Sequence, residues 1–327
     1  MQRHYLVTGA NGCVGRVLCR QLVAGGHSVR ALLRRPAAGP WQDSVCCELG
    51  REPLPAALCD GIDGVFHLAG VAHVADISAI PEVVYQRVNV EGTRALLAEA
   101  AGAGVAGFVF FSSVKAVADP GEDCVDETWD AAPADAYGRT KREAEGLVLA
   151  AADRMHCTVL RPALVYGPAV KGNLRRMIDA VGAGRFPPVA EFGNRRSMVS
   201  VADLAAAARL AMQRPEAAGR LYLVADGQDY STRSLYLAIR GALGLQVPRV
   251  AVPAWLLRVA GRAGDLAQVL MRRPAPVSTA VVQRLTGSAC YRADRLRADL
   301  GWVPAETFYS ALPDICGVRA SAEDRSQ

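Results

Sequence analysis

Lysine is almost absent from this chain of 327 residues. Of its 37 basic residues, only Lys115, Lys141 and Lys171 are lysine, so arginine supplies nearly every other positive charge. The net charge of +5 is modest and spread along the chain. The basic stripe with interleaved aromatic residues that a nucleic-acid-binding surface requires is missing, so no nucleic-acid partner is predicted.

Metal-binding cysteine patterns are missing as well. The nine cysteines form no Cys-x-x-Cys pair, and no histidine stands at a metal-ligand spacing from them, so we predict no metal site. We expect the cysteines to be buried small residues of a protein in a reducing compartment. No uncharged apolar run approaches the length of a membrane span, and the first predicted strand begins too early to leave room for a signal peptide. The sequence therefore predicts a cytoplasmic protein, whose 51% hydrophobic content supports a sizeable core.

Apolar strands alternate with amphipathic helices over the first half of the chain. Strands are expected near 4–8, 28–33, 64–68, 107–112 and 156–161, and helices near 12–25, 83–103 and 136–152. Such alternation predicts an α/β fold, a Rossmann-type doubly wound parallel sheet covered on both faces. We expect this domain over 1–161 and a smaller, discontinuous C-terminal cap over 162–316. Within it, 197–224 should return to the sheet as strand, helix and strand, and 317–327 should be a disordered tail.

A glycine-rich turn follows the first predicted strand and leads into a helical pattern. Glycines in such a turn let backbone N–H groups approach a pyrophosphate, and the helix dipole favours negative charge there. A plain tight turn is the alternative. The predicted dinucleotide-binding residues of this turn are Gly9, Asn11, Gly12, Cys13, Val14 and Gly15.

Tyr137 and Lys141 are four residues apart in a predicted helix and therefore share one face. An ammonium group beside a phenol favours the phenolate, so Lys141 is expected to lower the pKa of Tyr137 and make it an acid/base group. The alternative is an ordinary solvated pair. Ser112 and Ser113 end an apolar run upstream, where they could also form no more than a strand-end turn.

Taken together, these segments resemble the extended short-chain dehydrogenase/reductase family over nearly the whole chain. In detail they are most similar to bacterial enzymes of surface-polysaccharide synthesis that act on UDP-linked sugars. The matching segments are Thr-Gly-Ala-Asn-Gly-Cys-Val-Gly (8–15), His-Leu-Ala-Gly (67–70), Asn-Val-Glu-Gly-Thr (89–93), Phe-Phe-Ser-Ser (110–113), Tyr137 with Lys141, Arg-Pro-Ala-Leu-Val-Tyr-Gly-Pro (161–168), Asn-Arg-Arg-Ser-Met-Val-Ser-Val-Ala-Asp-Leu (194–204) and Leu-Gly-Trp-Val-Pro (300–304).

The resemblance implies roles for these residues. Ser113, with Ser112 as the fallback, would bind the substrate oxygen while Tyr137 transfers the proton, and Lys141 would also hold the nicotinamide ribose. Asn89 would support that ribose, although a helix N-cap is nearly as good an explanation. The resemblance further implies that Leu68, Ala69 and Gly70 pass under the cofactor, whereas His67 is expected to be a packed strand residue.

On the substrate side, the resemblance implies a UDP-sugar held through its diphosphate. Lys115, Asn173 and Arg196 are the candidate contacts, and Arg292 is a further one, since an arginine fork fits phosphate oxygens. All three lysines of the chain lie in segments that the resemblance assigns to the active site. Relatives commonly pair helices into dimers, so a homodimer is possible.

Two departures from the family pattern narrow the reaction. Dehydratases carry an acidic pair after the active-site hydroxyl residue, but Val114-Lys115 stands here, leaving 4-keto reduction or 4-epimerisation. The second strand ends in Leu33-Arg34-Arg35 without the carboxylate that binds an NAD ribose, so NADP(H) is preferred and NAD(H) remains possible. We therefore expect a 4-keto-sugar reductase. Alternatives are a UDP-sugar 4-epimerase, a reductase of a non-nucleotide carbonyl compound, and a non-catalytic dinucleotide-sensing protein.

Residues 252–273 combine apolar residues at helical spacing with arginines, which is also typical of a membrane-surface helix. We favour instead a cap helix that buries Leu256, Leu257, Val259 and Leu266 and leaves its arginines in solvent.

Overall fold

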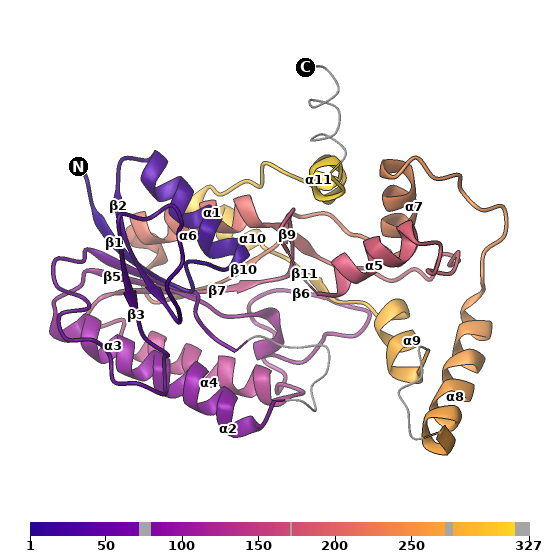
Figure 1. The fold of residues 1–327 in the computed structure, drawn as a ribbon, viewed down its shortest axis with the longest axis horizontal. Coiled ribbons are helices and arrows are strands. Elements are labelled where there is room, and N and C mark those ends of the chain that lie inside the picture. The colour runs from indigo at the N-terminus through magenta and orange to yellow at the C-terminus, as the bar shows by residue number, and fades with distance from the viewer. Residues whose placement is uncertain (72–79, 171, 272–276, 318–327) are drawn as a thin grey trace, which may run out of the picture.

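The protein is described by a computed structural model over residues 1–71, 80–170, 172–271 and 277–317. Seven parallel strands form its central sheet in the order β10-β7-β5-β4-β1-β2-β3 (Figure 1). The strands are β1 (His4–Thr8), β2 (Ser28–Leu33), β3 (Asp43–Cys46), β4 (Gly64–His67), β5 (Gly107–Phe111), β7 (His156–Pro162) and β10 (Arg220–Val224). The predicted fold class and all five predicted strands are confirmed, whereas β3 was missed.

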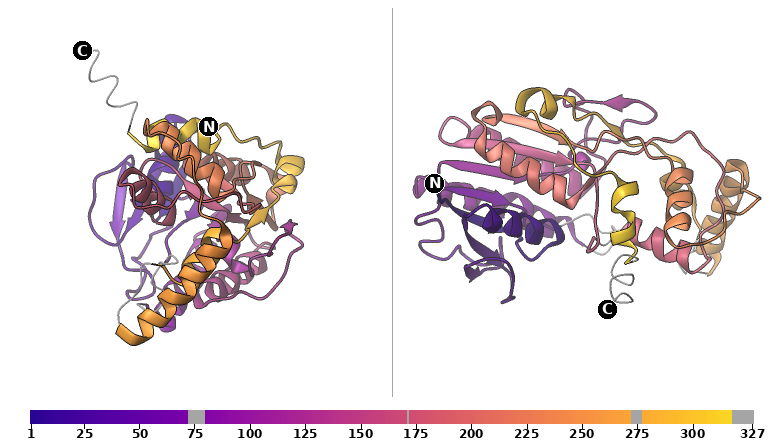
Figure 2. Two further views of the ribbon diagram at one scale, coloured as in Figure 1. Left: turned by 90° about the vertical axis from the view of Figure 1, so that its right-hand side faces the viewer. Right: turned by 90° about the horizontal axis from the view of Figure 1, so that it is seen from above.

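Helices cover both faces of this sheet (Figures 1 and 2). Because side chains of a strand alternate between faces, Tyr5 and Val7 enter one hydrophobic layer and Leu6 between them enters the other. The first layer is closed by α1 (Cys13–Ala24), α6 (Val201–Gln213) and α10 (Asp294–Leu300), and the second by α3 (Gly92–Gly102) and α4 (Ala136–Ala150).

The order of the strands creates a crevice at their carboxyl ends. From β1 the chain runs outward to β2 and β3, and then returns to β4 on the opposite side of β1. In open α/β sheets, ligands bind at such a reversal point, outside the carboxyl ends of the strands. The segments that follow β1 and β4 are therefore the expected walls of a binding site.

The helix expected near 83–103 is interrupted. It consists of α2 (Glu82–Tyr85), a π-helical turn (Gln86–Glu91) and α3. Asn89 lies inside the π-helical turn, so the interpretation of this residue as a helix N-cap is wrong. A π-helical turn inserts an extra residue into a helix and is frequent at functional sites.

The remaining elements extend from one end of the sheet. Two short parallel sheets pair β8 (Leu164–Tyr166) with β9 (Met198–Ser200) and β6 (Cys124–Val125) with β11 (Cys290–Tyr291). The helices there are α5 (Asn173–Gly182), α7 (Thr232–Ala242), α8 (Ala254–Met271), α9 (Thr279–Thr286) and α11 (Phe308–Ile315). Two 3-10 turns belong to the central sheet instead, Val114–Ala116 after β5 and Pro215–Ala217 before β10. The strand, helix and strand expected over 197–224 are β9, α6 and β10. Of the two strands, β10 joins the main sheet, whereas β9 pairs with β8 in a separate sheet. Lys171 and nearly all of the predicted 317–327 tail lie outside the described residues.

The expected burial of the 252–273 segment is largely wrong. Only Leu257 and Gly261 are buried in α8, whereas Leu256, Val259 and Leu266 are exposed. In the described part of the chain, no helix is both long enough and apolar enough to cross a bilayer.

Candidate active site

A cavity of about 670 Å³ opens at the carboxyl ends of β1, β2 and β4. Seven of the predicted cofactor residues line it: Gly9, Asn11, Gly12, Arg34, Leu68, Ala69 and Gly70. Cys13, Val14, Gly15, Arg35, Asn89 and Lys141 are not among its lining residues. Two lining residues that the sequence interpretation missed are Glu48 and Arg51, which pair at 3.2 Å just after β3.

The glycine turn can hold a phosphate group for reasons visible in its backbone. Gly9 has a φ of +66°, and a side chain there would put its Cβ 2.9 Å from the Ala69 nitrogen. Gly12 donates its N–H to the Gly9 carbonyl at 2.9 Å and immediately precedes α1. The first N–H groups of α1 have no helical acceptor, so the start of this helix suits the pyrophosphate of a dinucleotide.

Buried hydrogen bonds join this turn to the π-helical turn through His67. The Ala69 N–H donates to Thr8 Oγ1 at 3.0 Å, and Thr8 Oγ1 lies 2.7 Å from His67 Nδ1. His67 Nε2 lies 2.9 Å from Thr93 Oγ1, whose hydroxyl donates to the Asn89 carbonyl at 2.6 Å. Since each hydroxyl has one proton, the Thr93 oxygen must accept from His67 Nε2–H, and Thr8 must donate to Nδ1.

His67 is therefore a neutral connecting residue, as expected for a packed strand residue. Burial, with a smaller effect of Lys141, lowers the pKa of His67 to about 3. The side chain of Asn89 continues the connection, because its Oδ1 accepts from the Val71 N–H at 2.8 Å and its Nδ2 donates to Thr140 Oγ1 at 3.2 Å. Asn89 thus fixes the end of the Leu68–Val71 segment against α4.

Ser113 and Ser112 have different partners. Ser112 is buried and donates to Glu145 Oε1 at 2.5 Å, whereas the Ser113 hydroxyl hydrogen-bonds Tyr137. Ser113 is therefore the serine that the structure brings to the tyrosine. The start of α4 can lie this close to the turn after Ser113 only because residue 138 is glycine. A Cβ at Gly138 would lie 2.1 Å from the Lys115 carbonyl oxygen.

Lys141 is buried one helical turn after Tyr137. Its Nζ donates to the Phe111 carbonyl at 2.7 Å, at the end of β5, and lies 4.1 Å from the centre of the Phe110 ring. Burial lowers the pKa of Lys141 to about 7, against the opposing effect of Glu145. This lysine is close to its titration midpoint at neutral pH.

The expected lowering of the Tyr137 pKa is not found. Burial raises the pKa of Tyr137 to about 12, and the hydrogen bond with Ser113 only partly opposes this. A neutral tyrosine is therefore the resting form, held ready to donate a proton. Attraction between the Lys141 ammonium and a Tyr137 phenolate is outweighed here, because burial removes the hydration of both groups and so favours their neutral forms.

Beneath the serines, Glu145 and Arg161 form a buried ion pair that the sequence interpretation missed. The guanidinium makes two contacts with the carboxylate, at 2.6 and 2.8 Å, and both side chains are at most 6% exposed. The sequence did contain an indication that Glu145 is buried near the site. Glu145 follows Lys141 by four residues and so lies on the same face of α4.

Lys115 and Arg196, two of the predicted substrate contacts, face a common carboxylate. Lys115 Nζ pairs with Asp119 at 2.7 Å, the Tyr291 hydroxyl lies 3.3 Å from the same side chain, and Asp119 favours the charged form of Arg196. Asp119 and Tyr291 were not predicted. They are 172 residues apart, and nothing in the sequence indicated their contact.

The Arg196 segment is fixed on both sides. Its backbone exchanges hydrogen bonds with Tyr230 at 3.0 Å in each direction, and its guanidinium donates to the carbonyls of Arg284 and Gly287 near the end of α9. Burial lowers the pKa of Arg196 below its ordinary value. Arg196 is half-buried, and part of its hydrogen-bonding capacity is already used by the protein.

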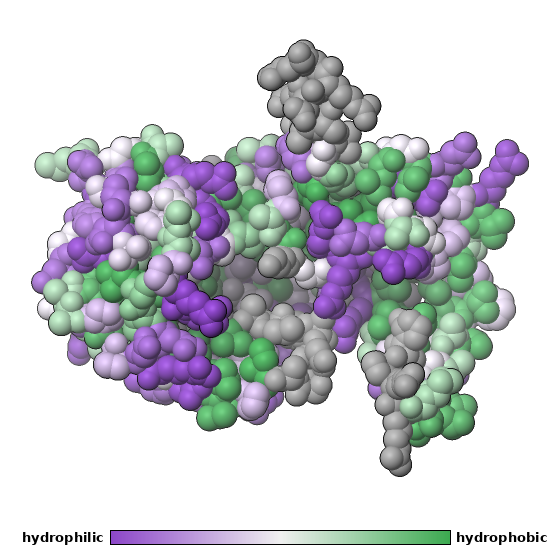
Figure 3. Space-filling model, in the orientation of Figure 1, coloured by the Kyte–Doolittle hydropathy of each residue, from purple (hydrophilic) through white to green (hydrophobic). Residues whose placement is uncertain are grey.

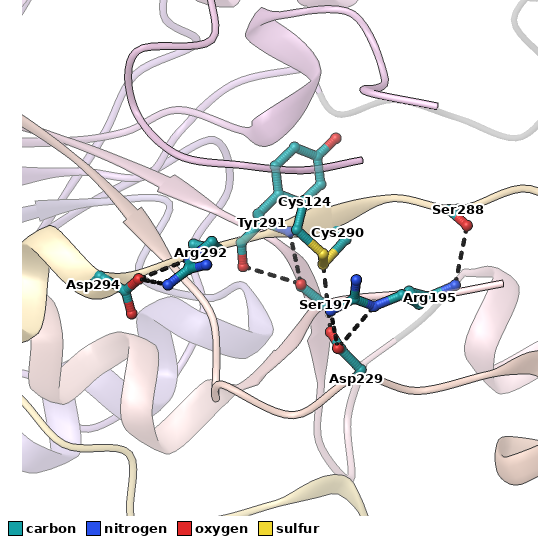
Figure 4. Close-up of a disulfide and its surroundings, with 9 residues drawn as sticks. All are labelled: Cys124, Arg195, Ser197, Asp229, Ser288, Cys290, Tyr291, Arg292 and Asp294. Atoms are coloured by element: carbon teal, nitrogen blue, oxygen red, sulfur yellow. Dashed lines mark hydrogen bonds and ion pairs between the residues drawn. A yellow bond between two sulfur atoms is a disulfide. The ribbon is translucent and has the colours of Figure 1, made fainter. Parts of the chain in front are cut away.

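A disulfide between Cys124 and Cys290 joins β6 to β11 beside this segment (Figure 4). The interpretation of all nine cysteines as buried small residues is wrong for this pair and for the exposed Cys46. The bridge connects the segment between Ser113 and Tyr137 to the strand that carries Tyr291. It thereby braces the wall of the site from which Asp119 and Tyr291 come.

Arg292 and Asn173 are less well placed. Arg292 is exposed and paired with Asp294 at 2.7 Å, and in Figure 4 both point away from Arg195 and Asp229. Asn173 is exposed at the first residue of α5. Neither residue is brought to the group around Asp119.

We expect Glu145→Ala to lower the free energy of unfolding by about 3–5 kcal/mol, because it leaves the buried Arg161 charge and the Ser112 hydroxyl without their acceptor. Urea unfolding measures the change. Glu143→Ala on the exposed side of α4 is the matched control and should change stability by less than about 0.5 kcal/mol. Equal effects of the two substitutions would contradict the stabilising role of the buried pair.

Lys141→Met should stabilise the fold near neutral pH. The pKa of Lys141 falls from an ordinary 10.5 to about 7 on folding, so between these pH values the unfolded chain binds more protons and wild-type stability rises with pH. The cost of burying the ammonium is therefore largest at and below pH 7. Thermal melts should show a higher Tm for the variant at about pH 6 and a smaller difference at about pH 10. A variant that melts below wild type at both pH values would refute this.

The chain is similar in sequence and in fold to several known proteins. The chain is 30% identical to a UDP-glucose 4-epimerase of Vibrio cholerae, over 99% of this chain and 98% of the relative. It is also 30% identical to a 4-hydroxy-2-methyl-3-oxo-4-farnesyl-3,4-dihydroquinoline-1-oxide ketoreductase of Stigmatella aurantiaca, over 94% of this chain and 93% of the relative. The fold matches the structure of MoeE5 in complex with UDP-glucuronic acid and NAD with a TM-score of 0.76 at 24% identity, covering 97% of this chain and 99% of that one.

The NAD dependent epimerase/dehydratase family model matches residues 5–225, which include the central sheet from β1 through β10 apart from His4. The chain belongs to the NAD dependent epimerase/dehydratase family.

Proposed function

We propose that this enzyme transfers a hydride between a nicotinamide dinucleotide and C4 of a UDP-sugar, and that it works as a 4-keto-sugar reductase. The observation that carries the proposal is the hydrogen bond between Ser113 and a neutral, buried Tyr137, one turn from the buried Lys141. The similarity to the UDP-glucose 4-epimerase supports a UDP-sugar as the substrate class.

The residues divide the chemistry among them. The dinucleotide, when bound, supplies or accepts the hydride. Ser113 holds the oxygen at C4, and the Tyr137 phenol gives its proton to that oxygen as the carbonyl becomes an alcohol. A pKa of about 12 keeps this proton on Tyr137 at neutral pH, which suits the acid required in reduction.

Lys141 has a positioning role in this mechanism. With Nζ bound to the Phe111 carbonyl, it holds the carboxyl end of β5 and the start of α4 at a fixed separation. We infer that its remaining N–H groups face the nicotinamide ribose, as the resemblance to short-chain dehydrogenases implies.

NADPH is the proposed cofactor. Arg34 and Arg51 both line the cavity where β2 and β3 end, and a guanidinium is suited to a ribose 2′-phosphate. Net reduction also consumes reducing equivalents, which agrees with a preference for NADPH.

UDP-sugar 4-epimerisation with NAD is the second candidate. Glu48 lines the same cavity, and a carboxylate there could accept a hydrogen bond from a ribose 2′-hydroxyl. The similarity to the UDP-glucose 4-epimerase of Vibrio cholerae supports this reaction. In this case Tyr137 would have to lose its proton in the first half of each cycle, against the burial that raises its pKa.

Reduction of a non-nucleotide carbonyl compound is a third candidate, favoured by the similarity to the Stigmatella aurantiaca ketoreductase. Arginines that could bind a diphosphate, Arg195 and Arg196, would favour a nucleotide-linked substrate instead. Arg195 pairs with Asp229, however, and Arg196 already binds two backbone carbonyls, so this objection is weaker than expected.

Tyr137→Phe should reduce turnover by about 100-fold or more, because it removes the transferable proton and keeps the ring. The assay follows NADPH oxidation with a UDP-4-keto-sugar and, separately, interconversion of UDP-sugars in the presence of NAD. Cofactor affinity, measured by fluorescence titration, should be unchanged. Near-normal turnover in the Phe variant would refute the role of Tyr137, and interconversion without net NADPH consumption would favour the epimerase.

Arg34→Ala should weaken NADPH binding by about 1–3 kcal/mol and leave NADH binding nearly unchanged, because only NADPH carries the 2′-phosphate. Isothermal titration with each cofactor measures both affinities. The exposed Arg154 offers a matched Arg→Ala control away from the cavity. Wild-type protein that purifies with tightly bound NAD would overturn the cofactor proposal.

A further inference from the structure

Helix α8 exposes a continuous apolar stripe. Trp255, Val259, Leu266 and Leu270 are 54–77% exposed, and their spacing of four, seven and four residues places them on one face of the helix. In Figure 3, drawn in the orientation of Figure 1, hydrophobic side chains gather over α8 at the lower right. Isolated exposed apolar residues need no explanation, but a stripe along an 18-residue helix does.

The opposite face of α8 is already occupied by α9. Leu257 and Gly261 are buried, and a Cβ on Gly261 would lie 3.1 Å from Val282 of α9. Asp265 Oδ1 accepts the Thr279 N–H at 3.1 Å, at the start of α9. Because α9 fixes α8 from this side, the apolar stripe faces outward.

Positive charge borders the stripe. Arg258 and Arg262 are exposed and follow Trp255 and Val259 by three positions, so they lie along one edge of the apolar face. The acidic residue of α8 is Asp265, which is engaged with α9. The exposed surface of α8 is therefore apolar with a cationic edge.

We propose that α8 docks on the surface of an anionic lipid bilayer. It lies in the plane of the interface, with Trp255, Val259, Leu266 and Leu270 among the acyl chains and its arginines at the lipid phosphates. This combination of an apolar face and a basic edge is typical of interfacial helices. The helix does not meet the requirements of a membrane span, which fits binding at the surface.

A second copy of the chain complements the stripe less well. Two α8 helices packed through their stripes would bring together surfaces that both carry Arg258 and Arg262 at the edge and expose no carboxylate to pair with them. Anionic headgroups supply that missing charge. Charge complementarity therefore favours the lipid surface.

Docking would connect the membrane to the site through α9. The carbonyls of Arg284 and Gly287, at the end of α9, accept hydrogen bonds from Arg196. The α8–α9 pair is thus a link between the bilayer surface and the segment that faces Asp119.

Vesicle co-sedimentation of the full chain tests the proposal. Wild type should bind vesicles of an equal mixture of phosphatidylcholine and phosphatidylglycerol, bind phosphatidylcholine alone much more weakly, and lose binding at high salt. The double variant Val259→Asp, Leu266→Asp should bind the mixed vesicles about 10-fold less tightly or worse, because two apolar side chains are lost from the interface. Val303→Asp, at an exposed valine outside α8, is the matched control and should bind like wild type.

Two further measurements separate docking from misfolding and from self-association. The double variant should melt like wild type, since both side chains are exposed, and Arg258→Glu, Arg262→Glu should lose the preference for anionic vesicles. Trp255 emission should shift to shorter wavelength on vesicle addition, a shift absent in Trp255→Phe. Equal vesicle binding by wild type and the double variant would overturn the proposal. A dimer that the double variant dissociates, without binding of wild type to vesicles, would do so too.

Discussion

The site depends on how one face of α4 is held against the carboxyl ends of β5 and β7. Tyr137, Lys141 and Glu145 recur every four residues on that face. Lys141 is tied to the Phe111 carbonyl at the end of β5, and Glu145 is tied to Arg161 in β7. These two buried contacts fix the helix along its axis, so the position of Tyr137 beside Ser113 follows from them. Burying Lys141, Glu145 and Arg161 costs free energy of folding. These groups nevertheless lie at the site, where the reacting side chains must be held in fixed positions.

A second set of buried contacts sets the cofactor side relative to this helix. The hydroxyls of Thr8 and Thr93 and the ring of His67 connect the glycine turn to the π-helical turn, and Asn89 in that turn contacts α4 through Thr140. The two hydroxyls and the His67 ring each donate one hydrogen bond and accept one. The hydrogen bonds therefore all run in one direction, and His67 has a single tautomer. The glycine turn and the helix of Tyr137 are therefore not placed independently.

The sequence was sufficient for the glycine turn and for every strand of the sheet except β3, because these rest on local spacing and on apolar runs. The role of Ser113 beside Tyr137 came from the family resemblance. It was insufficient where distant segments meet. Asp119 and Tyr291 come together through the β6–β11 pair, and Cys124 pairs with Cys290 across 166 residues. The sign of the Tyr137 pKa shift was also missed, because the loss of hydration depends on packing that no four-residue spacing reveals.

The same limit explains α8. Apolar residues at helical spacing show that a helix has an apolar face, but whether that face is buried depends on the number of partners that the fold supplies. Helix α6 packs against α1 and against β5 and β7 of the sheet, and its apolar residues are buried. Helix α8 is packed against α9 through Leu257 and Gly261, while its apolar residues extend well beyond that one face. The same helical spacing of apolar residues therefore gives a buried face in α6 and an exposed apolar face in α8. The exposed face of α8 can be covered only by a partner outside the chain.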